Sequence, residues 1–70
     1  MHEALPITVN GESERLAEPT TVAELLARFG IDRRKVAVER NLEIVPHSLY
    51  GETWLAAGDQ LEIVHFIGGG

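Results

Sequence analysis

The chain has 70 residues, a formal net charge of −5 at pH 7 and no cysteine. A chain of this length forms one domain and buries only about 60% of its unfolded surface, so its core is small. The absence of cysteine excludes disulfides and thiolate metal sites, and the negative charge argues against nucleic acid, whose binding rests on neutralising phosphates.

The first segment predicts a β-hairpin. Apolar residues alternate with others through residues 5–9, which is the pattern of a half-buried strand. Asn10 and Gly11 follow directly, and this dipeptide favours a type I′ turn because both central residues of that turn need positive φ. Residues 12–18 are therefore expected to return as a second, antiparallel strand, and their high charge suits the edge of a sheet.

Residues 20–30 predict an amphipathic helix. Thr21 and Glu24 have the spacing of a capping box, in which each side chain accepts a hydrogen bond from a free amide of the first turn. Gly30 stands where a helix end needs a left-handed residue. Four apolar residues share one face of this helix and are expected to enter the core: Val22, Leu25, Leu26 and Phe29.

The second half of the chain predicts three short strands around an irregular segment. One strand runs to Arg40-Asn41, where the chain can turn, and the next ends at Pro46, which has no amide to donate. Residues 47–59 are irregular, and residues 60–67 form the last strand. The large apolar side chains of the irregular segment are expected to cover the open end of the core: Leu49, Tyr50, Trp54 and Leu55.

These elements predict an α+β fold of the β-grasp type. The most economical arrangement is a mixed sheet of four to five strands, with the final strand beside the first and the single helix packed across one face. Parallel neighbours need a long crossover connection, which the chain between them supplies. Residues 1–67 are expected to form the domain, and residues 68–70 a flexible glycine tail.

The sequence shows no catalytic, nucleotide or metal site of its own. The three histidines, His2, His47 and His65, lie far apart without ligand spacing. No glycine-rich loop ends in Gly-Lys-Ser/Thr, and no helix follows the closing glycines to direct amides at phosphates. We therefore expect a chain that is not an enzyme, binds no metal or cofactor, and serves as the substrate of another enzyme.

Four of the six basic residues lie close together in the chain: Arg33, Arg34, Lys35 and Arg40. Most such clusters are solvated loop surface, and that is the interpretation adopted for this one. The remaining surface is acidic and can steer the chain toward a basic partner.

No targeting or membrane segment is evident. The apolar runs are far shorter than the ~20 residues that a membrane-spanning helix needs. The first residues lack a basic stretch followed by a long apolar one, so no secretory signal is expected. A cytoplasmic protein without a membrane partner is the expectation.

Five stretches of the chain carry a resemblance to a known family: "TTVAELL", "VAVERN", "IVP", "ET" and above all "GDQLEIVHFIGGG". In these stretches the chain resembles the ThiS family, the sulfur carriers of thiamin thiazole biosynthesis among the ubiquitin-like β-grasp proteins. Two positions depart from the family pattern. His47 stands where a basic residue is common after Val-Pro, and Tyr50 where tryptophan is frequent.

The resemblance implies a mechanism centred on the C-terminal carboxylate of Gly70. A partner similar to ubiquitin-activating enzymes would adenylate this carboxylate with ATP and Mg²⁺. A cysteine desulfurase or a rhodanese-type donor would then supply the sulfur that converts it to a thiocarboxylate, and thiazole synthase would take that sulfur. ATP and magnesium would belong to the partner.

The closing residues are expected to bind the partner. Three extended glycines reach at most ~10–11 Å beyond Ile67, and without Cβ atoms Gly68 and Gly69 can enter a narrow channel. Side chains alternate along the last strand, so Val64 and Phe66 are expected on the open face of the sheet, beside the tail. The alternative is that the irregular segment folds over these two side chains.

Three other functions remain open at this point. The small subunit of molybdopterin synthase is also a β-grasp sulfur carrier. A ubiquitin-like protein modifier would use the same activated tail to form isopeptide bonds. A plain binding module would have an inert glycine tail.

Overall fold

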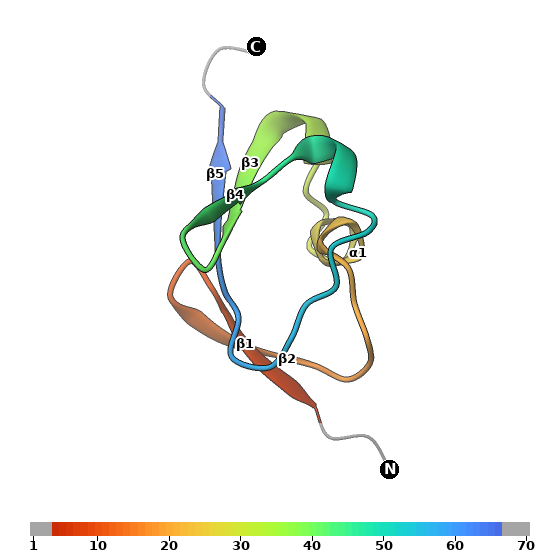
Figure 1. The fold of residues 1–70 in the computed structure, drawn as a ribbon, viewed down its shortest axis with the longest axis vertical. Helices are drawn as coiled ribbons and strands as arrows, with labels where there is room; N and C mark the ends of the chain where they lie inside the picture. Colours follow the sequence, from red (N-terminus) through yellow and green to blue (C-terminus); the bar gives the residue numbers. More distant parts are fainter. Residues whose placement is uncertain (1–3, 67–70) are drawn as a thin grey trace.

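The structure is a computed structural model that describes residues 4–66 of the chain. It contains five strands, one α-helix and two 3₁₀ helices (Figure 1). Their bounds are β1 (Leu5–Val9), β2 (Glu12–Leu16), α1 (Val22–Arg28), η1 (Arg33–Lys35), β3 (Val36–Arg40), β4 (Glu43–Val45), η2 (His47–Leu49) and β5 (Gln60–His65). The boundary that the sequence predicts after residue 67 lies outside the described residues.

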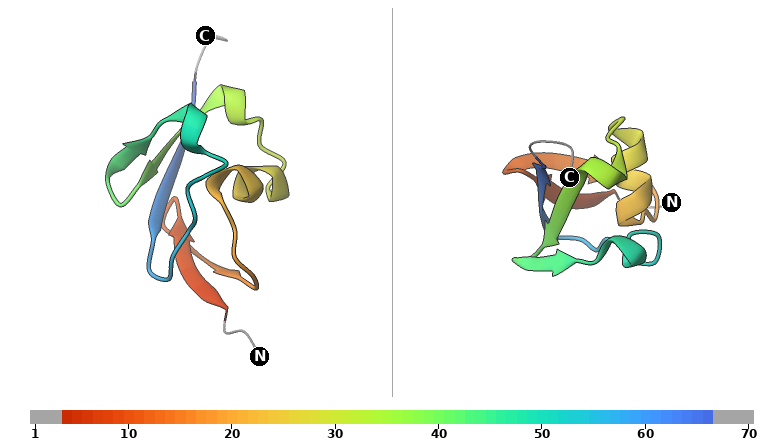
Figure 2. Two further views of the ribbon diagram at one scale, coloured as in Figure 1. Left: turned by 45° about the vertical axis from the view of Figure 1, so that its right-hand side comes forward. Right: turned by 90° about the horizontal axis from the view of Figure 1, so that it is seen from above.

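The strands form one mixed sheet in the order β2-β1-β5-β3-β4. The neighbours β1 and β5 are parallel, whereas the other three pairs are antiparallel. Helix α1 lies on one side of this sheet in both orientations shown (Figure 2). The predicted β-grasp arrangement, with the last strand beside the first, is confirmed.

Local signals set the ends of the first hairpin and of the helix. Asn10 and Gly11 have φ values of 51° and 84°, as a type I′ turn requires. The capping box of α1 is complete, because the Thr21 amide donates to the Glu24 carboxylate and the Glu24 amide donates to the Thr21 hydroxyl. At the other end Gly30 has φ 72°, and the hydrogen bonds of its amide and the next one form a Schellman cap.

The core lies between the sheet and α1. It comprises thirteen buried apolar residues between Ile7 and Ile63 in the sequence. The buried face of the strands agrees with the alternation in the sequence: Val36 and Val38 of β3 are buried, as are Leu61 and Ile63 of β5. Tyr50 is also fully buried, which confirms its predicted place over the end of the core.

Three large side chains that were predicted to be buried are exposed. Phe29 is 40% exposed and is the C-cap of α1, at the end of the helix. Trp54, which forms an isolated bridge with Thr21, is 57% exposed, whereas its neighbour Leu55 is buried. Leu49 lies at the exposed end of η2.

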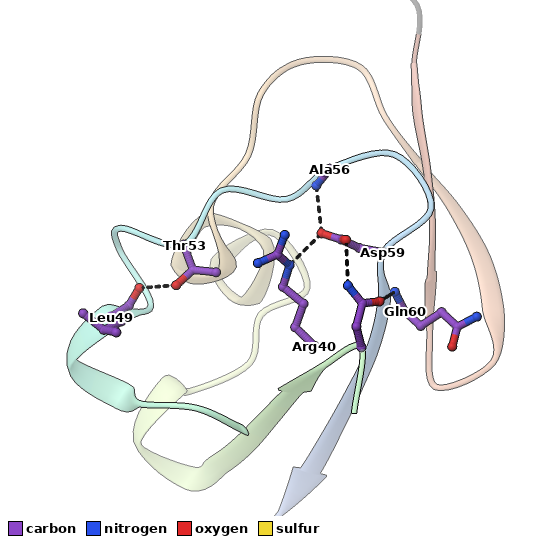
Figure 3. Close-up of polar contacts among 7 residues, drawn as sticks. Arg40, Leu49, Thr53, Ala56, Asp59 and Gln60 are labelled. Atoms are coloured by element: carbon purple, nitrogen blue, oxygen red, sulfur yellow. Dashed lines mark hydrogen bonds and ion pairs between the residues drawn. The ribbon is translucent and has the colours of Figure 1, made fainter. Parts of the chain in front are cut away.

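A second turn differs from the prediction by one residue. The positive φ values between β3 and β4 belong to Asn41 and Leu42, not to Arg40 and Asn41. Arg40 remains in β3, and its guanidinium donates to the Asp59 carboxylate (Figure 3). This contact joins residues 19 positions apart in the sequence.

Candidate partner-docking surface at the end of β5

The open face of the sheet bears two apolar side chains close to the end of β5. Val64 is 55% exposed and Phe66 is 47% exposed. Both belong to the set whose side chains alternate with the buried Leu61 and Ile63. The segment of residues 47–55 leaves them accessible, contrary to the alternative in which it folds over them.

Neighbouring strands extend this apolar surface. Ala37 of β3 lies directly opposite Val64 in the antiparallel register, and Ile44 of β4 lies opposite Glu39. Ile44 is largely exposed, whereas Ala37 is half-buried. Exposed apolar side chains gathered on one face near a strand end are typical of a protein–protein contact.

The backbone holds Phe66 in place although it follows the last residue of β5. Its amide donates to the carbonyl oxygen of Lys35 at 2.9 Å, which continues the pairing of β5 with the start of β3. The chain therefore leaves the sheet beside η1. This is the end of the molecule from which residues 67–70 continue.

His47 and Tyr50 lie beside Phe66. The ring centroid of His47 is 4.8 Å from that of Tyr50 and 6.2 Å from that of Phe66. His47 Nε2 lies 2.9 Å from the carbonyl oxygen of Val36, an acceptor that requires a proton on Nε2. The Tyr50 hydroxyl donates to the same oxygen at 3.5 Å, and burial raises the pKa of this phenol, so it stays neutral at physiological pH.

The predicted site is thus described only in part. Val64 and Phe66 are where the alternation placed them. Ile67, Gly68, Gly69 and Gly70 lie outside the described residues, so their roles stay predictions. Sequence reasoning missed His47 and Ile44 as neighbours of this surface. Only the alternation of Ile44 with the buried Val45 gave a signal, and the contact of His47 depends on the tertiary fold.

Residues 4–66 contain neither a metal-binding cluster nor a membrane-spanning helix. No group of three His, Cys, Asp or Glu side chains in this part of the chain could hold a metal ion. Within the same residues, no helix has the length and apolar character to cross a membrane. The buried Asp59 carboxylate has a structural role instead, because it accepts from Arg40, Asn41 and the Ala56 amide (Figure 3).

Comparisons with known proteins identify close relatives. The chain is 40% identical over 65 residues to the "Sulfur carrier protein ThiS" of Bacillus subtilis, covering 91% of this chain and 98% of that protein. It is 53% identical over 66 residues to a "Thiazole synthase" of Paramagnetospirillum magneticum and 46% identical to one of Magnetococcus marinus. The chain spans only about a fifth of the length of these two proteins, 20% in each case.

Solved structures agree with these sequence matches. The crystal structure of a thiamine biosynthesis protein (ThiS) from Geobacter metallireducens has a TM-score of 0.80 and 33% sequence identity. The match covers 94% of this chain and 100% of that one. The family model described as "ThiS family" matches residues 6–70, which is nearly the whole chain. The chain belongs to the ThiS family.

Proposed function

We propose that this chain is a sulfur carrier of thiamin thiazole synthesis, with the sulfur held on the carboxyl group of Gly70. One observation supports this most strongly. The family match extends through residue 70, and the Bacillus subtilis sulfur carrier is matched over 98% of its length. In this role the chain is the substrate of an activating enzyme and does no catalysis itself.

The proposed chemistry starts from a carboxylate, which is a poor electrophile at neutral pH. In the active site of an adenylating partner, this carboxylate attacks the α-phosphate of ATP. Pyrophosphate leaves, and an acyl-adenylate forms. The terminal sulfur of a persulfide donor then attacks the carbonyl carbon, and AMP leaves. A thiol cleaves the resulting S–S bond, so that one sulfur remains on Gly70 as a thiocarboxylate. ATP and Mg²⁺ are bound by the partner, and the need for ATP supports a cytoplasmic location.

Thiazole synthase is the proposed acceptor of the sulfur. Two relatives with that name contain a segment similar to this chain within about a fifth of their length, 20% in each. A carrier segment and an acceptor joined in one protein are held close to each other. This supports a contact between carrier and acceptor when they are separate chains. The surface of Val64 and Phe66 beside the tail is the proposed contact, because both side chains are exposed in the described structure.

The experiment changes only the end of the chain. Deleting Gly70, or adding a tag after it, is expected to abolish adenylation by the partner. Thermal stability should stay unchanged, since the core lies between Ile7 and Ile63. Formation of an acyl-adenylate is measured by ATP–pyrophosphate exchange, and unfolding by circular dichroism. Full exchange activity of the tagged chain would contradict the proposal.

A further inference from the structure

Helix η1 places three consecutive basic residues next to the point where the chain leaves the sheet. Arg33, Arg34 and Lys35 are all exposed. The carbonyl oxygen of Lys35 accepts from the Phe66 amide, and the residue after η1 is paired in register with His65. Figure 1 shows η1, the turn between α1 and β3, at the same end of the molecule as the end of β5. We call these three residues the η1 cluster.

The η1 cluster has two positive charges that no carboxylate in residues 4–66 offsets. Arg34 is paired with Asp32 at 3.1 Å, whereas Arg33 and Lys35 form no ion pair with any described residue. The chain as a whole has a net charge of −5. Arg40, the fourth basic residue of this region in the sequence, is bonded to Asp59 and does not belong to the cluster. A local positive surface on an acidic molecule sets the orientation in which it approaches a charged partner.

Local contacts hold the backbone of the η1 cluster and the side chain of Arg33. The Asp32 side chain caps η1 by accepting from the Arg34 amide at 2.9 Å, and the Asp32 carbonyl oxygen accepts from the Lys35 amide. The Arg33 guanidinium carbon lies 5.9 Å from the ring centroid of Tyr50, within the range of a cation–π contact. Because the backbone of η1 is already ordered by these contacts, binding through it costs less conformational entropy than binding through a loose loop.

Side-chain contacts link the cluster to the apolar surface near the end of β5. Tyr50 contacts Arg33 on one side and His47 on the other, and His47 in turn lies beside Phe66. A partner that accepts the tail must therefore cover or border both.

We propose that the η1 cluster binds an acidic surface, formed by Asp and Glu side chains, at the rim of the active site of the adenylating partner. This rests on the proposed function. Four extended residues after Phe66 reach at most ~13–14 Å, so the reacting carboxylate and the phosphates of ATP lie beyond the cluster. The cluster faces the protein around the entrance. Its two charges also offset the repulsion between an acidic rim and the carboxylate that has to pass it.

The test compares two doubly substituted chains with the same change in net charge. Arg33→Glu/Lys35→Glu reverses the cluster, whereas Arg15→Glu/Arg28→Glu reverses two exposed arginines on β2 and α1. The value of kcat/KM for adenylation by the purified partner is measured from about 0.01 M to 1 M NaCl, where the Debye length falls from about 30 Å to 3 Å.

We expect reversal of the cluster to lower kcat/KM at least about tenfold at low salt, with kcat unchanged, because steering of charged partners changes association by 10- to 1,000-fold. The difference should vanish at high salt, and the control should lose less than about threefold. Arg33→Gln/Lys35→Gln should give an intermediate loss, and it provides the same test if the reversed chain does not fold.

An equal loss in the cluster variant and in the control would show an effect of net charge alone and overturn the proposal. So would a wild-type kcat/KM independent of salt. In either case adenylation of the wild-type chain would leave the proposed function intact. If the wild-type chain is not adenylated at any salt concentration, both proposals are wrong.

Discussion

The Asp59 carboxylate joins the turn after β3 to the start of β5. It is 5% exposed and accepts from Arg40 Nε at 2.9 Å, Asn41 Nδ2 at 3.1 Å and the Ala56 amide at 2.8 Å. Burial alone would raise its pKa. The three hydrogen bonds and the charge of Arg40 outweigh burial and hold the pKa of Asp59 below its ordinary value.

This predicts a stability that depends on pH through one side chain. The unfolded pKa of Asp is about 3.9, and the folded pKa of Asp59 is lower. The unfolded state therefore binds the proton first, and the free energy of unfolding falls as the pH drops from about 4 through the folded pKa. Asp59→Asn should be less stable by about 1–3 kcal/mol at pH 7, and the gap should narrow on acidification.

Urea unfolding at pH 7 and at several values below pH 4 measures this gap. Asp32→Asn is the matched control, because the hydrogen bond from the Arg34 guanidinium lowers the pKa of Asp32 to about 2 on an exposed surface. Solvent screens such a pair, so the control should change stability little at pH 7. A gap for Asp59→Asn that stays constant down to pH 2 would contradict the assignment.

Leu42 has an unfavourable backbone conformation. Its φ is 72°, in the left-handed region, and its side chain is 82% exposed, so no burial compensates. The left-handed conformation costs a residue with a Cβ roughly 1–2 kcal/mol, which glycine does not incur. Glycine has greater entropy in the unfolded chain, and this cancels part of the gain. Leu42→Gly should therefore stabilise the chain by about 0.5–1 kcal/mol and raise Tm by about 2–8 °C. Ile44→Gly, in the adjacent strand, should lower Tm; a lower Tm for both variants would contradict the explanation.

Among the elements, β5 directs alternate side chains to the core and to the open face of the sheet. Leu61 and Ile63 belong to the core, whereas Val64 and Phe66 face away from it. Phe66→Ala should weaken binding to the adenylating partner or to thiazole synthase by about tenfold or more, as the loss of a central interface aromatic does. Its free energy of unfolding should fall by less than about 1 kcal/mol, because the side chain is half exposed.

Calorimetric titration gives the affinity, and thermal unfolding gives the stability. Trp54→Ala is the control, since Trp54 is an exposed aromatic on a segment outside the sheet. Equal losses of affinity in both variants would place the contact elsewhere. A large loss of stability with normal binding would show that Phe66 is structural.

Elements with local signals could be predicted from the sequence. The turn at Asn10 and Gly11 and the two caps of α1 each depend on a few adjacent residues, and all three formed as expected. The turn at Leu42 gave no such signal, because leucine does not favour positive φ. Phe29 and Trp54 fit an apolar pattern, but both side chains are exposed in the fold. Phe29 lies at the C-cap of α1, and Trp54 lies in an isolated bridge outside the sheet.

At the scale of the whole molecule, only part of the docking surface could be predicted. Alternation along one strand places Val64 and Phe66 on the open face without knowledge of the fold. His47 and the η1 cluster join them through the pairing of β3 with β5, which brings together residues about 30 positions apart in the sequence. The sequence therefore predicts the apolar part of the surface, whereas its charged border depends on topology.

Intact-mass spectrometry measures whether Gly70 carries sulfur as a thiocarboxylate, as we propose. The chain is incubated with the adenylating partner, ATP, Mg²⁺ and a persulfide donor, with omission of ATP as the control. We predict a mass gain equal to the replacement of one oxygen by one sulfur, located by fragmentation on the last residue and dependent on ATP. An unchanged mass after complete consumption of ATP would contradict the account, as would a gain equal to the mass of another protein.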